Sequence, residues 1–291
     1  MQVLDYVSAG SVEEVVGLLA SNNGRARILC GGTDLLVQLR ENRRRSGLLI
    51  DVKNIPELTS INYDDQSGLW LGAAASCHAI CHNRFVLEKY PGLVDAIRLI
   101  GGVQIQYRAS MGGNLCNASP AADSIPALIV HEAGCIIMGS NGTREIPVQQ
   151  FCVAPGKNVL QNGEFLLAIK VPAVKENFGA HYLRFIPRNE MDIAVVGAGA
   201  SVTLDKAKQK ILSARIALAA VAPTPLFVEE AGTFLVGKEM TEENILEAAR
   251  IAQATARPIS DLRGTEQYRK HLCAVLTRRA LEKAVERARA S

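Results

Sequence analysis

The sequence has little of what would place it in several common classes of protein. No apolar run approaches the roughly 20 residues of a membrane-spanning helix, and the first residues show no basic segment followed by an apolar one. Lys and Arg number 32 against 29 Asp and Glu, and a net charge of +3 is too small to predict a nucleic-acid-binding surface. Seven cysteines, an odd number, do not form a disulfide framework and are typical of a reducing compartment. We therefore expect a cytoplasmic protein that binds neither membranes nor nucleic acid.

Motifs for catalysis and metal binding are absent from the sequence as well. It contains no Ser-His-Asp nucleophile elbow, no HExxH and no Walker lysine. The closely spaced cysteines and histidines of residues 77–82 would need a second ligand pair to hold zinc, and no nearby segment supplies one. We therefore predict no metal site and no catalytic side chain, and expect the chemistry to come mainly from a cofactor.

Two glycine pairs are the most informative feature that is present. Gly31-Gly32 lies within residues 28–34, and Gly112-Gly113 lies within residues 109–117. Each pair follows apolar or small residues and precedes a short polar side chain, which predicts a strand that ends in a tight turn with N–H groups able to bind an anion. Main-chain amides bind a dinucleotide pyrophosphate without the burial of lysines. The two pairs therefore predict a phosphate group that is held from two sides.

Small polar side chains follow the second pair closely. Asn114, Asn117, Ser119 and Asp123 all lie within ten residues of Gly113 and could bind sugar hydroxyls and phosphate oxygens. Asp123 is a natural acceptor for a ribose hydroxyl. Alternatively, it caps the apolar helix predicted at residues 125–130, and the two roles are compatible.

Three further segments each leave two interpretations open. Residues 195–201 resemble the first glycines of a nicotinamide-nucleotide turn, but Val202 replaces the third glycine and the pattern favours a strand. The charged segment 184–194 could tune a redox ring or be a solvated loop. The arginines at 43–45 form either a solvated loop or a contact with a phosphate or partner.

Hydrophobic periodicity predicts alternating helices and strands in a chain long and apolar enough to bury a substantial core. Ser11 and Glu14 form a capping box that opens the first helix, and Asn141-Gly142 between apolar runs predicts a hairpin. Strands are predicted at 27–30, 47–52, 69–74, 135–138, 144–148, 165–171, 181–185, 193–204 and 214–220, and further helices at 35–39, 77–89, 93–100, 241–256 and 265–291.

Three segments together resemble the FAD-binding subunit of the molybdenum hydroxylases, the family of xanthine dehydrogenase and carbon monoxide dehydrogenase. They are residues 28–35, residues 110–115 with Ser119, Pro120 and Asp123, and residues 188–194, and they occur in the family's order. The resemblance covers essentially the whole chain. The length and the closing segment, including residues 221–225, are most similar to the separate FAD subunit of bacterial xanthine dehydrogenases.

The resemblance implies an α+β fold of the vanillyl-alcohol-oxidase (PCMH) type. Residues 1–55 and 56–175 would form two α+β subdomains that sandwich FAD, and residues 176–291 a third, with an antiparallel sheet and helices. Tyr107 lies where some members carry an aromatic residue against the flavin, and we do not assign it that role. One branch of the family inserts a loop with a four-cysteine cluster, which this sequence lacks. FAD would then be the only redox centre of the chain.

The resemblance also implies the cofactor contacts. Two loops would hold the pyrophosphate, and Leu166, on a strand, would contact the flavin or adenine ring. Arg184 would lie beside the flavin ring. Arg188 and Asp192 would lie on the mobile segment that controls access of the electron acceptor. The implied FAD-binding residues are Ile28, Leu29, Cys30, Gly31, Gly32, Thr33, Asp34, Ser110, Gly112, Gly113, Asn114, Asn117, Asp123, Leu166, Arg184 and Asp192.

The implied function is electron transfer within a heteromeric complex. Electrons would pass from a 2Fe-2S iron–sulfur subunit through FAD to NAD or another acceptor, while hydroxylation would occur on a separate molybdopterin-containing catalytic subunit. Three alternatives stay open: a nicotinamide dehydrogenase that uses Gly197 and Gly199, an FAD oxidoreductase that stands alone or serves carbon monoxide or an aromatic substrate, and a non-catalytic nucleotide-binding subunit.

Overall fold

The chain begins with a small parallel sheet. The computed structural model describes residues 4–188 and 191–291. Ser11 Oγ accepts the Glu14 N–H and starts the first helix, which buries Val12, Val15 and Leu19. The elements are β1 (Asp5–Ser8), α1 (Val12–Ser21), β2 (Ala26–Leu29), α2 (Leu35–Arg40) and β3 (Leu48–Asp51), and the strand order is β1-β3-β2. The sequence predicted β2 and β3 but missed β1, which is short and largely exposed.

A five-stranded antiparallel sheet follows. Its order is β4-β5-β10-β6-β7, and a hairpin at Asn141 and Gly142 joins its last two strands, as predicted. Its strands are β4 (Ile61–Asp64), β5 (Gly68–Gly72), β6 (Gly134–Gly139), β7 (Gly142–Pro147) and β10 (Phe165–Val171). The helices of this region are α3 (Pro56–Thr59), α4 (Cys77–His82), α5 (Arg84–Lys89), α6 (Pro91–Ile97), α7 (Val103–Gln106), α8 (Met111–Asn117), α9 (Ser124–Val130) and the 3-10 helix Val148–Gln150, and β8 (Cys152–Ala154) pairs with β9 (Lys157–Asn158).

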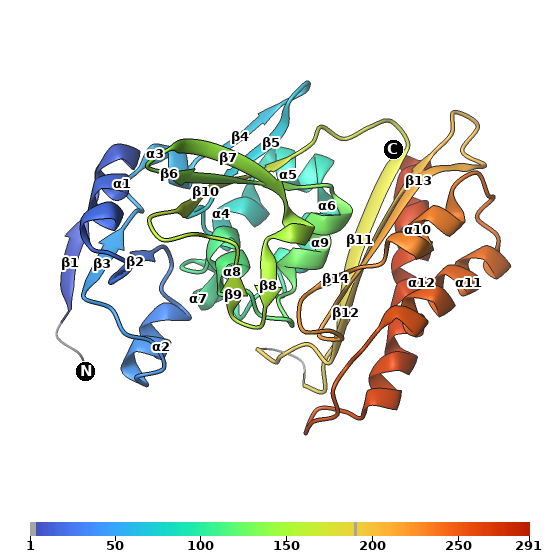
Figure 1. Ribbon diagram of the computed structural model, residues 1–291. Coiled ribbons are helices and arrows are strands. Elements are labelled where there is room, and N and C mark those ends of the chain that lie inside the picture. Colours follow the sequence, from blue (N-terminus) through green and yellow to red (C-terminus); the bar gives the residue numbers. More distant parts are fainter. Residues whose placement is uncertain (1–3, 189–190) are drawn as a thin grey trace.

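The last part of the chain forms an antiparallel sheet covered by helices. Its strands are β11 (Phe178–Phe185), β12 (Val196–Leu204), β13 (Ile211–Ala219) and β14 (Leu226–Phe227), and its helices are α10 (Glu229–Leu235), α11 (Glu242–Thr255) and α12 (Glu266–Ala290). α12 packs along β11 and β12, while α6 and α9 pack on β11 and β13. Figure 1 shows this sheet between α6 and α9 in the middle of the molecule and the orange and red helices at the right.

The placement of β12 decides one of the open alternatives. Each of its residues is buried, and the strand runs without interruption through Gly197 and Gly199 to Leu204. No helix follows these glycines, because the chain returns directly as β13. The segment is therefore a buried strand of small residues, and it cannot be the phosphate-binding turn of a nicotinamide-nucleotide fold.

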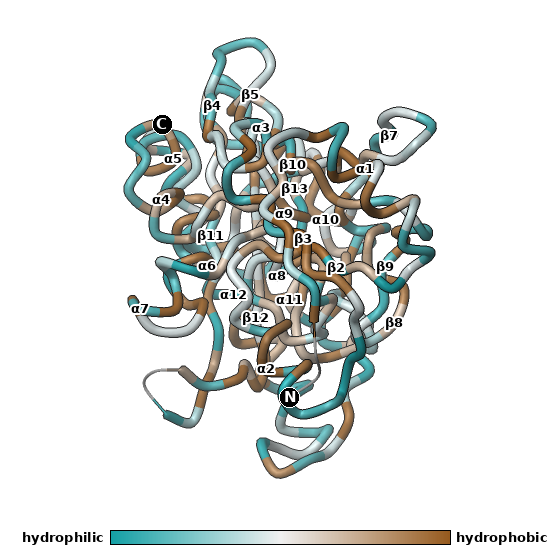
Figure 2. Tube along the Cα trace, turned by 90° about the vertical axis from the view of Figure 1, so that its left-hand side faces the viewer, coloured by the Kyte–Doolittle hydropathy of each residue, from teal (hydrophilic) through white to brown (hydrophobic). Residues whose placement is uncertain are grey.

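Two large hydrophobic cores underlie these sheets, and a small third cluster contains Leu29, Leu39 and Leu49. One large core is shared by the first and second sheets, and the other lies between the third sheet and the C-terminal helices. Figure 2 shows hydrophobic residues along inner elements such as β3 and α9, and hydrophilic residues at the tip that joins β4 to β5. We propose subdomain boundaries after residues 55 and 175, since each of the three large sheets then lies within one subdomain.

Candidate cofactor site

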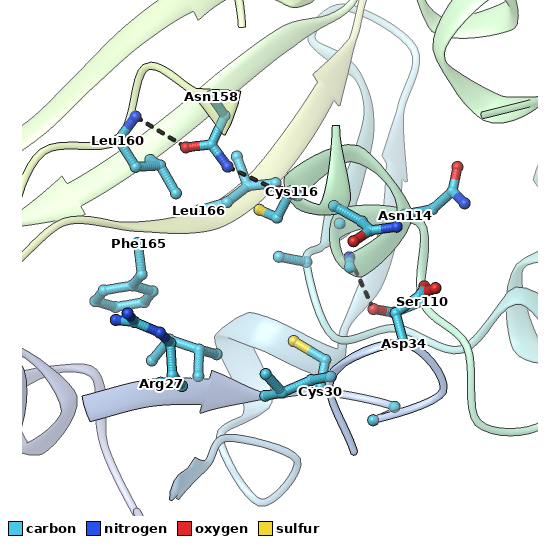
Figure 3. Close-up of a pocket in the computed structure, with 18 of the residues that line it drawn as sticks. Arg27, Cys30, Asp34, Ser110, Asn114, Cys116, Asn158, Leu160, Phe165 and Leu166 are labelled. Atoms are coloured by element: carbon cyan, nitrogen blue, oxygen red, sulfur yellow. Dashed lines mark hydrogen bonds between the residues drawn. The ribbon is translucent and has the colours of Figure 1, made fainter. Parts of the chain in front are cut away.

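The two glycine pairs lie on the same cavity. Its volume is about 410 Å³, and its lining comes from the β2–α2 turn, from α8 and from the segment that joins β9 to β10. Figure 3 shows Cys30 on one side, Asn114 of α8 and its N-cap Ser110 on another, and Asn158, Leu160 and Leu166 opposite β2. Segments more than 70 residues apart in the sequence thus enclose a single space between the first and second sheets.

Most of the residues implied by the resemblance line this cavity. These are Ile28, Cys30, Gly31, Gly32, Thr33, Asp34, Ser110, Gly112, Gly113, Asn114, Asn117 and Leu166. Four others lie outside its lining. Leu29 is buried with Leu39 and Leu49 on the other side of the first sheet, and Asp123, Arg184 and Asp192 belong to the ion pairs described below.

The first glycine pair forms the turn between β2 and α2. Gly32 has φ of +77°, a left-handed conformation that favours glycine. Gly31 packs on the segment that leads to α8, because a methyl group there would come within 1.8 Å of the Arg108 carbonyl oxygen. Lys53 donates to the Cys30 carbonyl at 3.1 Å and to Asp51 at 2.6 Å, which fixes the start of the turn to the end of β3.

The second pair does not lie in a strand-end turn, as the sequence suggested, but in the first turn of α8. Ser110 is the N-cap, and its Oγ accepts the Gly113 N–H at 3.0 Å. A methyl group on Gly112 would come within 2.4 Å of the Ala73 carbonyl oxygen, whereas one on Gly113 would meet only Ser110 Oγ within 4 Å. The first turn of a helix also presents N–H groups without helical acceptors, together with the positive end of the helix dipole. This arrangement suits an anion on the cavity side of Gly113.

The last turn of α8 is held by residues that the sequence analysis missed. Asn158 on β9 donates to the Cys116 carbonyl at 2.8 Å and accepts the Leu160 N–H at 3.1 Å. Gln38 of α2 donates to Asn117 Oδ1 at 3.0 Å. The sequence gives no local signal that Asn158 holds a distant helix, since asparagine is common in turns because its side chain bonds to the nearby backbone.

Two arginines also line the cavity. Arg27 on β2 donates to the carbonyls of Gly24 and Ala26, and its Nε is buried without a hydrogen-bond partner. Burial, and then the charge of Arg44, lower the pKa of Arg27. Arg44 is half-buried on the lining, while its neighbours Arg43 and Arg45 are exposed. Arg44 thus belongs to the cavity lining, whereas Arg43 and Arg45 are solvated, as one of the two interpretations of the arginine run expected.

Two cysteine thiols on the lining stay protonated. Burial raises the pKa of Cys30 to about 11 and that of Cys116 well above the ordinary value. The charged groups on the lining are Arg27 and Arg44 against Asp34 and Glu164, and Glu164 is neutralised by its ion pair with Arg144, so the two arginines outnumber the one remaining carboxylate.

Asp123 and Arg184 form a buried ion pair behind α8. Arg184 Nη1 lies 2.5 Å from Asp123 Oδ2, and the Tyr182 hydroxyl donates to Asp123 Oδ1 at 2.7 Å. Burial raises the pKa of Asp123 to about 6, although Arg184 and Tyr182 oppose the rise. Asp123 occupies the N-cap position of α9 but makes no capping hydrogen bond. Its neighbour Ser124 donates to Asn114 at 2.7 Å, which joins this pair to the cavity lining.

The charged segment before β12 lies at the surface. Arg188 donates to Asp192 at 3.1 Å, and Met191 is exposed and close to Gly102. Asn189 and Glu190, which belong to the third segment of the resemblance, lie outside the described residues.

No metal or membrane feature emerges from the described part of the chain. Among residues 4–188 and 191–291, no group of three or more His, Cys, Asp or Glu side chains could hold a metal ion. None of the helices found there has both the length and the apolar content of a membrane span.

The observed residues fit a dinucleotide. Both glycine segments line the cavity, the first turn of α8 presents N–H groups without helical acceptors, and Arg27 and Arg44 belong to the same lining. Its volume lies within the range of small-molecule sites, which is about 300–1,000 Å³.

Comparison with known proteins places the chain in a family. Residues 2–174 match the FAD binding domain in molybdopterin dehydrogenase, and residues 181–284 match the CO dehydrogenase flavoprotein C-terminal domain. The chain is 29% identical to the xanthine dehydrogenase FAD-binding subunit of Escherichia coli O157:H7, over 96% of this chain and 95% of that protein. It is 32% identical to the carbon monoxide dehydrogenase medium chain of Hydrogenophaga pseudoflava, over 96% of each.

Solved structures agree with this placement. The carbon monoxide dehydrogenase from Hydrogenophaga pseudoflava that lacks the Mo-pyranopterin moiety matches with a TM-score of 0.93 and 30% identity, over 98% of both chains. The quinoline 2-oxidoreductase of Pseudomonas putida 86 matches with a TM-score of 0.90 and 27% identity, over 99% of this chain and 98% of that chain. The α+β fold expected from the resemblance is thereby confirmed. The chain belongs to the molybdenum hydroxylase family as an FAD-binding subunit of an oxidoreductase.

Proposed function

We propose that the cavity between the first two sheets holds FAD, with its pyrophosphate between the Gly31-Gly32 turn and the first turn of α8. The single observation that carries this proposal is that both glycine segments line one cavity that also contains Arg27 and Arg44. FAD, when bound, accepts electrons and passes them on, and the chain's own residues bind and orient it. Leu166 would contact a ring of the cofactor from β10.

The buried ion pair of Asp123 and Arg184 would help to position the cofactor. Asp123 and Arg184 lie one hydrogen bond from the lining, through Ser124 and Asn114. The pair would fix the start of α9, and Ser124 of that helix would hold Asn114 toward the flavin end of the site. Asp123 or Arg184 would contact FAD directly if the bound cofactor broke the ion pair between them. Arg188 and Asp192 would lie on the segment that controls access of the electron acceptor.

The electron route is a further part of the proposal. Electrons would enter from a 2Fe-2S iron–sulfur partner subunit, reach FAD and leave to NAD or another acceptor, and hydroxylation would occur on a molybdopterin-containing partner subunit. Relatives are named as a medium chain and as a subunit of a dehydrogenase complex, which supports a heteromeric assembly. We propose a xanthine dehydrogenase-like complex in the cytoplasm.

The test begins with the purified chain. We expect a yellow protein that releases close to one FAD per chain on denaturation, and whose flavin is bleached by NADH under anaerobic conditions if NAD is the acceptor. A colourless protein that binds no added FAD would contradict the proposed function. Flavin that NADH leaves oxidised, but that a reduced ferredoxin bleaches, would contradict only the choice of acceptor.

The substrate and the partners need the assembled complex. Co-purification with an iron–sulfur subunit and a molybdopterin subunit, followed by xanthine-dependent reduction of FAD, is the expected result. Reduction by carbon monoxide but not by xanthine would replace the proposed substrate and leave the FAD site unchanged.

A further inference from the structure

Arg269, near the start of α12, is a buried cation outside the cofactor cavity. Its side chain is 4% exposed, and its guanidinium binds acceptors on three different segments of the chain. Nη1 donates to the Val195 carbonyl at 2.8 Å and to the Ala220 carbonyl at 3.1 Å, and Nη2 donates to Asp261 Oδ1 at 2.6 Å. Because a buried charge is costly unless it is paired and hydrogen-bonded, these contacts fix where the guanidinium lies.

The contact with Val195 supports the strand end that carries Arg184. The Val195 N–H donates to the Phe185 carbonyl at 2.9 Å, so Arg269 holds the residue that precedes β12 against the last residue of β11. Arg184 directly precedes Phe185 in that strand. The rings of Phe185 and Tyr268 also meet edge to face, with their centroids 5.9 Å apart. The start of α12 therefore supports the backbone from which the Arg184 side chain extends.

The contact with Ala220 reaches the segment that carries Asp123. Ala220 has φ of +64°, a left-handed conformation that is unfavourable for alanine and that persists only where neighbouring contacts hold it. Its carbonyl accepts from Arg269, and its N–H donates to the Pro120 carbonyl at 2.7 Å. Pro120 lies three residues before Asp123, in the turn that the Ala122 N–H closes on the Ser119 carbonyl. One residue, Ala220, thus links Arg269 to the Asp123 segment.

The contact with Asp261 leads to the surface. Asp261 and Gly264 exchange backbone hydrogen bonds of 3.1 and 3.2 Å and so form a tight turn. A methyl group on Gly264 would lie 3.6 Å from a side-chain carbon of Val195, so this turn packs beside the same strand end. Hydrogen bonds from the Arg263 N–H and from Arg269 lower the pKa of Asp261, which is 30% exposed. Its carboxylate is therefore the counter-ion of Arg269 at neutral pH.

We propose that Arg269, with Asp261 as its counter-ion, is the positioning residue of the Asp123–Arg184 ion pair. Arg269 holds the Arg184 side through Val195, and it holds the Asp123 side through Ala220. The two charges behind α8 thereby keep one geometry relative to each other. This inference rests on the proposed function, in which that ion pair helps to position the cofactor.

The first measurement is residue-resolved amide hydrogen exchange in the full-length apoprotein. The Val195 and Ala220 N–H groups report the two joints. Arg269→Lys keeps the charge but has one donor nitrogen in place of a planar group, so exchange at both amides should become about tenfold faster or more, as expected for one lost charge-assisted hydrogen bond. Arg263→Gln, which removes an exposed charge from the same turn, is the matched control and should exchange as the wild type does. Wild-type exchange at both amides in Arg269→Lys would overturn the inference.

The second measurement is the midpoint potential of bound FAD. A cation beside a flavin stabilises its reduced anion, so a displaced Arg184 should make this potential more negative. We expect Arg269→Lys to lower the potential while oxidised FAD binds as tightly as in the wild type. A purely structural defect would instead weaken FAD binding and lower stability to urea without a change in potential, and that result would also overturn the inference.

A second variant keeps the test decisive if Arg269→Lys folds poorly. Asp261→Asn acts from the exposed end of the contact and should lower the potential in the same direction, whereas Arg263→Gln should leave it unchanged. A wild-type potential in Asp261→Asn and in Arg269→Lys would count against the positioning role. Failure of the wild-type protein to bind FAD at all would contradict the proposed function, and the exchange rates of the apoprotein would still decide whether Arg269 holds the two joints.

Discussion

Gly31, Gly112 and Gly113 look alike in the sequence but have different reasons to be glycine. Gly31 and Gly112 lie against the backbone carbonyls of Arg108 and Ala73, so a side chain would separate segments that must touch. Gly113 lines the cavity, and a methyl group there would meet no backbone atom of another segment but only the side-chain Oγ of Ser110, at 2.9 Å. At the residue scale, two of these glycines serve the packing of the fold, and only the third is left without such a backbone neighbour beside the cavity.

Alanine substitutions should separate these roles. We expect Gly112→Ala to lower the free energy of unfolding by about 1–3 kcal/mol, the usual cost of overpacking. The new methyl group would press on the Ala73 carbonyl oxygen, a backbone atom that cannot turn away as a flexible side chain could. Gly113→Ala should change stability little, because the higher helix propensity of alanine is offset by the displacement of Ser110 Oγ, which would lie 2.9 Å from the new methyl group, while that methyl group weakens FAD binding. Urea unfolding of the apoproteins and FAD titration measure the two effects. A Gly113→Ala protein that binds FAD as the wild type does would show that the cofactor does not approach α8 there.

At the scale of elements, α8 is positioned at both ends by side chains. Ser110 caps its first turn, and Asn158 of β9 holds the Cys116 carbonyl in its last turn. The helix has only seven residues, too few to be stable alone, so its place depends on these contacts and on packing.

Removal of Asn158 should therefore loosen the site. Asn158→Ala leaves the Cys116 carbonyl and the Leu160 N–H without their partner, and we expect a loss of about 1–3 kcal/mol in unfolding free energy together with faster release of FAD. Stopped-flow release of FAD and urea unfolding measure the change. Asn62→Ala, on an exposed position of β4, is the control and should change neither quantity. Equal FAD release from the two variants would contradict the positioning role.

At the scale of the whole molecule, partly buried polar groups join helix α6 to the third sheet and to α12. Asp95 of α6 accepts from Arg287 of α12 and lies 2.6 Å from His181 of β11. His131, at the end of α9, packs between Tyr90 and Phe178, and its Nδ1 lies 2.7 Å from the Ala127 carbonyl. Burial lowers the pKa of His131 from 6.5 to about 4.

This histidine should make stability fall with acidity. The unfolded chain binds a proton at this residue below about pH 6.5, whereas the folded chain does so only near pH 4, so unfolding is favoured as the pH falls between these values. The contribution, full above pH 6.5, is on the order of 3 kcal/mol and is lost by about pH 4. Urea unfolding at pH 7 and pH 4.5 measures it, and His131→Gln should flatten the difference. An unchanged pH dependence in that variant would assign the effect to other groups.

Local patterns were enough to predict many of the elements. The capping box at Ser11, the Asn141-Gly142 hairpin, the strand β10 and the strand character of β12 all follow from side-chain chemistry within a few residues. β1 could not be found in this way. It is a short exposed strand that is stabilised by pairing with β3, more than 40 residues away in the sequence.

The sequence by itself determined where glycine allows two segments to approach closely, since the absence of a side chain is a local property, and from this it predicted a phosphate-binding site. Only the tertiary structure decided which residues share the cavity. It brought Arg27, Arg44 and Asn158 to the lining, turned Leu29 away, and paired Asp123 with Arg184. These outcomes depend on packing between residues that are dozens of positions apart, and no local pattern records such contacts.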